Sequence, residues 1–255
     1  MTIYLILFFI TGLLFGSFYN VVGLRLPKKE SIIYPSSHCP KCNHKLSWYE
    51  LIPVLSYIFL KGKCKNCKEK ISIMYPVMEL ISGILFALSY YSFGLTLSII
   101  PALLTSSIFV IIVVSDLNYY IIPDSILAIY GILMFIYNII SKGFLEACTY
   151  VVYGLIMFIF MYLLMKLGNF LFKEESLGGG DIKLMGVLGQ LFNPFMSFIS
   201  LALASLIAIP SSLFFNIKKK DNIIPFGPFI TGGFLIMLFS KLDLQTILDF
   251  LTFTK

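Results

Sequence analysis

The feature that most restricts this fold is a series of long apolar segments that carry no charge. Ile3 to Gly23 and Leu95 to Ser115 both lack any charged side chain, and about 20 apolar residues suffice for a helix to cross a bilayer. Hydrophobic residues make up 58% of the 255 residues, and charged residues only 13%. A soluble domain of this size could not bury so much apolar surface. We therefore expect an all-α, polytopic membrane helical bundle.

The apolar pattern predicts about eight helices. The sixth is short and is expected to be tilted or partly covered by its neighbours. The first lacks a basic start and a small-residue cleavage site, so we interpret it as a retained helix and not as a signal peptide. The expected spans cover residues 3–24, 75–93, 95–115, 124–141, 146–166, 181–193, 195–215 and 225–240.

Charge is concentrated in one segment, which sets the expected orientation. Ten of the nineteen Lys and Arg residues lie between Arg25 and Lys70. By the positive-inside rule this segment is cytoplasmic, so the N-terminus would lie outside. Counting spans places Asp116 and Asp181 at the same, cytoplasmic, face. A nucleic-acid surface is the weaker interpretation, because cysteines lie within the segment and apolar spans flank it.

These observations divide the chain into four parts. A first transmembrane helix (1–24) precedes a small cytoplasmic module (25–74), which is followed by a membrane core (75–240) and an amphipathic tail (241–255). Within the module, residues 46–60 are apolar but too short to span. We expect them to lie on the lipid bilayer.

The module contains two C-x2-C knuckles, and four thiolates arranged in this way typically hold a structural Zn²⁺. A disulfide framework is the alternative, but a cytoplasmic compartment is reducing. His38 and His44 flank the first knuckle and could replace a thiolate, although a position outside the ligand set is favoured. The expected ligands are Cys39, Cys42, Cys64 and Cys67.

Two acids stand at the edges of apolar segments, where an ionised carboxylate is costly and therefore suggests function. Asp116 ends one apolar run, at a helix C-terminus that disfavours negative charge. Asp181 follows Gly178, Gly179 and Gly180, which allow close approach of another chain and lead into a helix N-terminus. An ordinary helix cap is the alternative for Asp181. We predict an aspartyl dyad in which two close carboxyl groups share one proton.

Two further acids have open roles. Asp124 follows Pro123 and precedes an apolar run, so an N-cap role accounts for it. Glu79 lies early in the second span. It is expected either to pair with a cation, such as a lysine of the module, or to face water at the interface.

Several motifs along the chain resemble those of the type IV prepilin leader peptidases, membrane aspartyl proteases of the GxGD class. The resemblance extends over nearly the whole chain, and its motifs are specific in combination. They are Gly16–Val22 with Arg25–Pro27, the two cysteine knuckles with 47–53 between them, Tyr75–Leu80, Asp116 with Ile122–Asp124, Gly178–Met185 and Pro225–Phe229.

This resemblance implies a function. The substrate would be a prepilin or pseudopilin, cut after its short basic leader at the cytoplasmic face of a bacterial inner membrane. Asp116 and Asp181, not Asp124, would be catalytic. Members with the cysteine loop often also methylate the new N-terminus from S-adenosylmethionine. No Rossmann-type glycine fingerprint is visible, and Gly62 and Lys63 are weak candidates for the methyl-donor site.

Two other classes of function compete with this interpretation. A zinc-containing transporter would need further polar residues at mid-membrane depth, and the spans are nearly free of them. A scaffold would use the cysteine module for docking and would tolerate a change at Asp181. A GxGD protease with another substrate is a closer rival, against which the cysteine knuckles argue.

Overall fold

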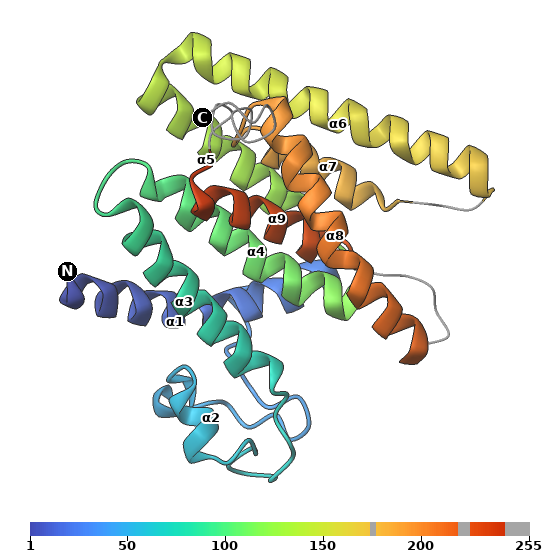
Figure 1. Ribbon diagram of the computed structural model, residues 1–255. Helices are drawn as coiled ribbons and strands as arrows, with labels where there is room; N and C mark the ends of the chain where they lie inside the picture. The colour runs from blue at the N-terminus through green and yellow to red at the C-terminus, as the bar shows by residue number, and fades with distance from the viewer. Residues whose placement is uncertain (174–176, 219–224, 243–255) are drawn as a thin grey trace. The chain divides into compact units, whose positions relative to one another are not determined.

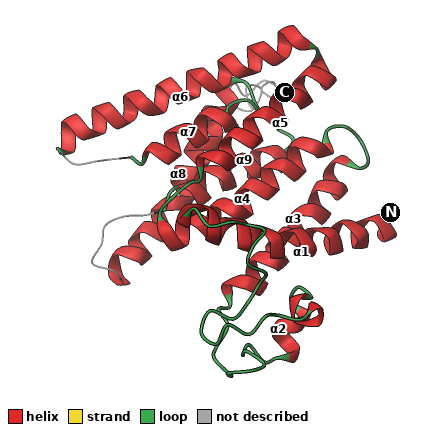
Figure 2. Ribbon diagram, turned by 180° about the vertical axis from the view of Figure 1, so that it is seen from behind, coloured by secondary structure: helices red, strands yellow, loops and turns green. Residues whose placement is uncertain are grey.

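The computed structural model describes residues 1–173, 177–218 and 225–242. Across these residues it is helical, with no strand (Figures 1 and 2). The elements are α1 (Thr2–Arg25), η1 (Leu26–Lys28), η2 (Trp48–Leu51), α2 (Leu55–Phe59), α3 (Met74–Phe93), α4 (Ile99–Tyr119), α5 (Asp124–Lys142), α6 (Phe144–Phe172), α7 (Gly179–Leu188), α8 (Pro194–Lys218) and α9 (Gly227–Ser240).

The expected all-α membrane fold is confirmed, with each predicted span represented by one helix. Five of the described helices are long and apolar enough to cross a membrane, namely α1 with η1, α3, α4, α5 and α6. Two further apolar stretches are shorter, namely Pro194–Pro210, which is part of α8, and Gly227–Ser240, which is α9. Many large apolar side chains on these helices are exposed, as expected for surfaces that face lipid.

Two expected spans need correction. The helix expected at 95–115 begins at Ile99 and continues to Tyr119, so Asp116 lies inside its last turn. The expected sixth span, 181–193, is a helix of only 10 residues, α7. At 1.5 Å per residue it is about 15 Å long, half of the roughly 30 Å hydrocarbon thickness. A helix this short cannot cross on its own.

The chain forms two compact units, and α4 contributes to both. The first unit contains residues 1–99 and 110–119, with α1, α3 and the cysteine module. The second contains residues 100–109 and 120–255, with α5 to α9. In Figure 2 the module within the first unit consists mostly of loops, interrupted by the short helix α2.

Small residues hold the first unit together. Gly12 and Gly16, four residues apart on α1, pack against α3: a Cβ on Gly12 would come within 2.6 Å of the Ser82 carbonyl oxygen. A Cβ on Gly16 would come within 2.9 Å of the Glu79 Cα. Because lipid gives no hydrophobic drive for helix association, close packing at small residues is the usual means of holding membrane helices together.

Glycines also allow close helix packing in the second unit, around α7. Gly186 and Gly189 of α7 and its C-cap pack against Gly154 of α6. The amide of Asn138, a buried residue of α5, donates to the Gln190 carbonyl just after α7 (3.3 Å). Four of the ten α7 residues are buried, and all four are large and apolar, so helices of the same unit partly cover this short helix, as expected from the sequence.

Candidate active site and metal centre

The four expected metal ligands meet at one point. The sulfur atoms of the two knuckles all lie within 4.8 Å of one another, with Cys39 and Cys67 3.8 Å apart and Cys42 and Cys64 3.9 Å apart. A tetrahedral site with Zn–S bonds near 2.3 Å requires sulfur–sulfur distances of about 3.8 Å. The cluster could therefore hold a metal ion, and its spacing fits tetrahedral zinc.

The protonation chemistry of this cluster also suits a cation. The backbone N–H groups of Cys42 and Lys41 lower the pKa of the Cys39 thiol to about 6. The Glu69 N–H lowers the pKa of Cys67, but desolvation and the three neighbouring cysteines outweigh it and raise that pKa to about 11. Four thiolates this close repel one another, so a bound dication would stabilise them.

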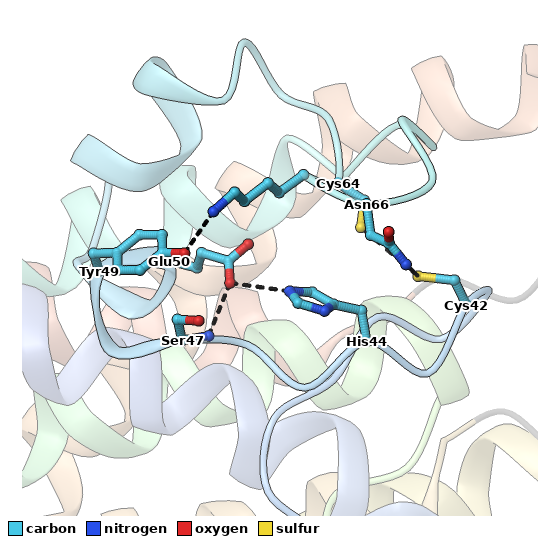
Figure 3. Close-up of polar contacts among 8 residues, drawn as sticks. Cys42, His44, Ser47, Tyr49, Glu50, Cys64 and Asn66 are labelled. Atoms are coloured by element: carbon cyan, nitrogen blue, oxygen red, sulfur yellow. Dashed lines mark hydrogen bonds and ion pairs between the residues drawn. The ribbon is translucent and has the colours of Figure 1, made fainter.

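A buried carboxylate braces the first knuckle (Figure 3). Glu50 accepts the Ser47 N–H at 2.8 Å and contacts His44 Nε2 at 3.2 Å. The His44 carbonyl in turn accepts the Cys39 N–H at 2.9 Å. The described metal cluster contains cysteines only, which agrees with a position for His44 outside the ligand set. Spacing alone gave no signal for Glu50, whose role emerges from the fold.

The two weak methyl-donor candidates have structural roles in the loop. Gly62 has φ +68°, a conformation that favours glycine, and its missing Cβ leaves room for the Tyr57 hydroxyl, which would lie 2.9 Å away. Lys63 pairs with Lys70 in an isolated antiparallel bridge. The turn and this packing account for glycine at position 62 without any ligand.

Glu79 is buried, with 8% of its surface exposed. The partner expected from the sequence was a lysine of the module or water. In the structure, the carboxylate accepts the Val54 backbone N–H at 2.7 Å and a hydrogen bond from the Ser17 hydroxyl. The carboxylate is thus satisfied by neutral donors, one from α1 and one from the module.

Asp116 lies in the last turn of α4, in the first unit. Only 5% of its surface is exposed, and the adjoining Ser115 and Val114 are fully buried. This part of α4 packs against α1 at Gly23, where a Cβ would lie 2.8 Å from Val114. A buried carboxyl at this place fits a functional acid better than an interfacial charge.

Asp181 belongs to the second unit and lies in the first turn of α7. Its carboxylate folds back over the N-cap residue Gly178, where a Cβ would lie 3.2 Å from Asp181 Oδ2. Gly180 packs against Ile122, which a Cβ would approach to 3.1 Å. None of the three glycines has a positive φ. Gly178 and Gly180 thus serve close approach, whereas Gly179 has open space around it.

Asp124 does not cap its helix, contrary to the expectation. Pro123 is the N-cap of α5, and no side chain caps it. Instead, Lys183 Nζ lies 2.8 Å from both carboxylate oxygens of Asp124. Lys183 follows Asp181 by two residues on α7, and nothing in the sequence pattern singled it out. The ion pair joins the start of α5 to the glycine-rich helix start.

Comparison with known proteins agrees with the sequence motifs. A family model described as Bacterial Peptidase A24 N-terminal domain matches residues 10–93, and one described as Type IV leader peptidase family matches residues 103–213. The first matched range contains the cysteine module and Glu79; the second contains Asp116 and Asp181. No solved structure matches the chain.

Curated relatives match over most of the chain. The chain is 35% identical to a prepilin leader peptidase/N-methyltransferase of Bacillus subtilis (strain 168), over 89% of this chain and 91% of the relative. It is 34% identical to a protein of the same description from Vibrio cholerae serotype O1, over 93% and 97%. A Neisseria gonorrhoeae relative of that description is 29% identical, over 89% and 87%.

The fold and the functional residues define a multi-pass, helical membrane protein with a four-cysteine cluster that could hold a metal ion and with two acids at helix ends, of which Asp116 is buried. The chain belongs to the type IV leader peptidase family. This membership confirms the family resemblance seen in the sequence, and it lends no support to the transporter and scaffold alternatives.

Proposed function

We propose that this protein removes the leader peptide from type IV prepilins or pseudopilins and then N-methylates the new N-terminal residue. The relatives described as prepilin leader peptidase/N-methyltransferase support both activities. The observation that carries the proposal is the placement of two acids at helix ends. Asp116 lies buried in the last turn of α4, and Asp181 lies in the first turn of α7.

In the proposed mechanism the two carboxyl groups share a proton. The ionised carboxylate takes a proton from water as the water attacks the scissile carbonyl carbon. The protonated carboxyl donates a hydrogen bond to the carbonyl oxygen, which becomes the oxyanion. The N-terminal end of α7 favours a negative charge on Asp181, whereas the C-terminal end of α4 disfavours one on Asp116. Asp181 is therefore proposed as the ionised partner.

We place both acids at the cytoplasmic face, and five helices support this. Starting from an outside N-terminus, α1 crosses inward, α3 outward, α4 inward, α5 outward and α6 inward. Asp116 at the end of α4 and Asp181 after α6 then share one side with the basic module. All five helices are long enough to cross, so the placement does not depend on the short α7.

We assign zinc to the four-cysteine cluster, in a structural role, because four protein ligands leave no open coordination position. The segment between the knuckles carries large exposed side chains, with Trp48 at 77% and Phe59 at 79% exposure. Lysines surround it in the sequence. These features support the assignment of residues 46–60 to the membrane surface, where amphipathic aromatic side chains and cations are favoured.

S-adenosylmethionine is the proposed methyl donor, and its methyl group would pass to the amine released by cleavage. Proteolysis frees an N-terminal amine, so methyl transfer must follow it. Gly62 and Lys63 of the loop remain the proposed contacts. The positive φ of Gly62 is explained by its turn, so Lys63, whose side chain is exposed, is the better position to test.

Co-expression with a prepilin, read by intact mass, tests both activities. Wild-type enzyme should remove the leader and add one methyl group's mass. Asp116→Asn and Asp181→Asn should both leave the prepilin at full length, because each variant lacks one of the two carboxyl groups that share the proton. Substantial cleavage by either variant would remove that acid from the proposed pair. An unmodified amine on fully cleaved product would refute the methyl transfer alone.

A further inference from the structure

Three segments that are distant in the sequence meet at Glu79. The carboxylate lies on α3 and accepts the Val54 backbone N–H at 2.7 Å, across 25 residues of sequence. It also accepts a hydrogen bond from Ser17 of α1. Gly16, next to Ser17, lets α1 approach so closely that a Cβ there would lie 2.9 Å from the Glu79 Cα. Glu79 therefore links α3 to both α1 and the module.

The backbone of the module is strained at the residue that contacts Glu79. Val54 has φ +63° and ψ −51°, and such positive-φ conformations are rare for a β-branched residue. They persist where the surrounding structure enforces them. The N–H that this conformation presents is the one bound by Glu79, and α2 starts at the next residue. The strained residue is thus the point of attachment to the membrane helices.

A second contact strengthens the same region of the first unit. Asn20, one turn after Ser17 on α1, donates its amide to the Tyr75 carbonyl at the start of α3 at 3.2 Å. Asn20 is almost fully buried. The end of α1 and the start of α3 are thereby held together beside the attachment point, so that Glu79 has a fixed position from which to bind the module.

We propose that Glu79 is the positioning residue that anchors the segment between the knuckles to α1 and α3. Glu79, Ser17 and Val54 all lie in the region matched by the N-terminal family model, residues 10–93, and both proposed catalytic acids lie outside it. The proposed methyl-donor contacts, Gly62 and Lys63, lie in the module that Glu79 anchors, so loss of the anchor should impair methyl transfer more than cleavage. This second consequence depends on the proposed bifunctional activity, whereas the anchor itself does not.

The variants are chosen so that the acceptor atom is tested separately from the charge. Glu79→Ala removes the acceptor, whereas Glu79→Gln keeps an amide oxygen that can still accept the Val54 N–H. Ser17→Ala removes one donor only and leaves the Val54 contact in place, so it separates the contact with α1 from the contact with the module. Glu30→Gln is the control, because Glu30 is an exposed acid within the cysteine module, 25–74, and away from the Glu79 contact.

Amide hydrogen exchange of the full-length protein in lipid nanodiscs measures the anchor directly. Glu79→Ala should speed exchange in peptides covering 52–60 by about tenfold or more, since it removes a charge-assisted hydrogen bond. Glu79→Gln and Ser17→Ala should change it by less than about threefold, and Glu30→Gln not at all. Exchange at the knuckles, 36–46 and 62–71, and the zinc content should stay at wild-type values because the cysteines still hold the metal.

The prepilin assay supplies the functional readout. Glu79→Ala should lower the ratio of methylated to cleaved product by about tenfold, with leader cleavage within about threefold of wild type. Glu79→Gln should restore the ratio. Unchanged exchange at 52–60 in Glu79→Ala, or loss of zinc in parallel with faster exchange, would overturn the anchor. If the wild-type enzyme cleaves without methylating, the proposed second activity fails, while the exchange data still decide the anchor.

Discussion

At the scale of single residues, three acids with similar sequence settings have different environments. Asp181 folds over the glycine that caps its own helix. Asp124 is 70% exposed at its side chain and pairs with Lys183, which is 52% exposed. Glu79 is buried and bound by a backbone N–H and a hydroxyl. The sequence does not show how exposed each acid is or which group it contacts. These two properties distinguish the proposed catalytic acid Asp181 from the surface ion pair of Asp124 and from the anchor Glu79.

The exposed ion pair yields a prediction about Asp124. Exposed pairs contribute about 0–1 kcal/mol, so Asp124→Asn should reduce leader cleavage by less than about fivefold, whereas Asp181→Asn should abolish it. Initial rates of prepilin cleavage, measured at equal enzyme content, distinguish the two. High salt should reproduce part of the small Asp124→Asn effect by screening. An equal loss of cleavage in Asp124→Asn and Asp181→Asn would contradict the interpretation of Asp124 as one half of an exposed, non-catalytic ion pair.

At the scale of secondary-structure elements, glycines decide which helices touch. The contact of α1 with α3 depends on Gly12 and Gly16, whose missing side chains admit α3 backbone atoms. The sequence shows these glycines four residues apart, a spacing typical of helix contacts in membranes. It does not show that α3 is the partner, because any helix with small residues could fill that position.

Substitution of these glycines should separate the helices. Gly12→Val would place a branched side chain against the Ser82 carbonyl and Gly83 Cα and should lower the thermal midpoint in detergent, at a cost of about 1–3 kcal/mol from overpacking. Gly232→Ala is the matched control, since its Cβ would meet nothing closer than 3.8 Å. It should leave the midpoint unchanged or raise it, because alanine favours helix. Equal thermal midpoints for both variants would argue against close packing of α1 on α3 at Gly12.

The cysteine module gives a second prediction at this scale. It has only 50 residues, mostly in loops, and below about 70–80 residues a single core rarely suffices, so a metal often supplies the missing stability. Purified protein should contain about one zinc ion per chain. Removal by a strong chelator should release the four thiols to a thiol reagent and speed amide exchange at 36–46 and 62–71. Full protection of those peptides without metal would mean that the hydrogen bonds of Glu50 and the knuckles suffice.

At the scale of the whole molecule, the proposed topology depends on five helices that are long and apolar enough to cross a membrane. The expected topology places Lys173, at the end of α6, on the cytoplasmic face with the basic module, and Lys142, at the end of α5, on the opposite face. Because the count to Asp181 ends with α6, the short α7 does not alter it.

Cysteine labelling in intact cells tests this topology. In a Cys148→Ala background, Lys142→Cys should react with a membrane-impermeant thiol reagent, and Lys173→Cys should react only after the cells are permeabilised. The positive-inside rule predicts this result from the lysines of the module. Labelling of Lys173→Cys in intact cells would place Asp181 on the outer side and contradict cleavage at the cytoplasmic face.

The sequence by itself determined the membrane class, the helical content, the four cysteines that cluster and the family. Each of these depends on local composition or spacing: uncharged length for a span, C-x2-C for a knuckle, and contiguous motifs for the family. The tertiary structure decided the partners. It paired Asp124 with Lys183, gave Glu79 a backbone N–H in place of a lysine, and shortened the expected sixth span to a helix covered by its neighbours. Partners of this kind lie 25 to 59 residues apart in the chain, and only packing, which no local pattern encodes, brings them together.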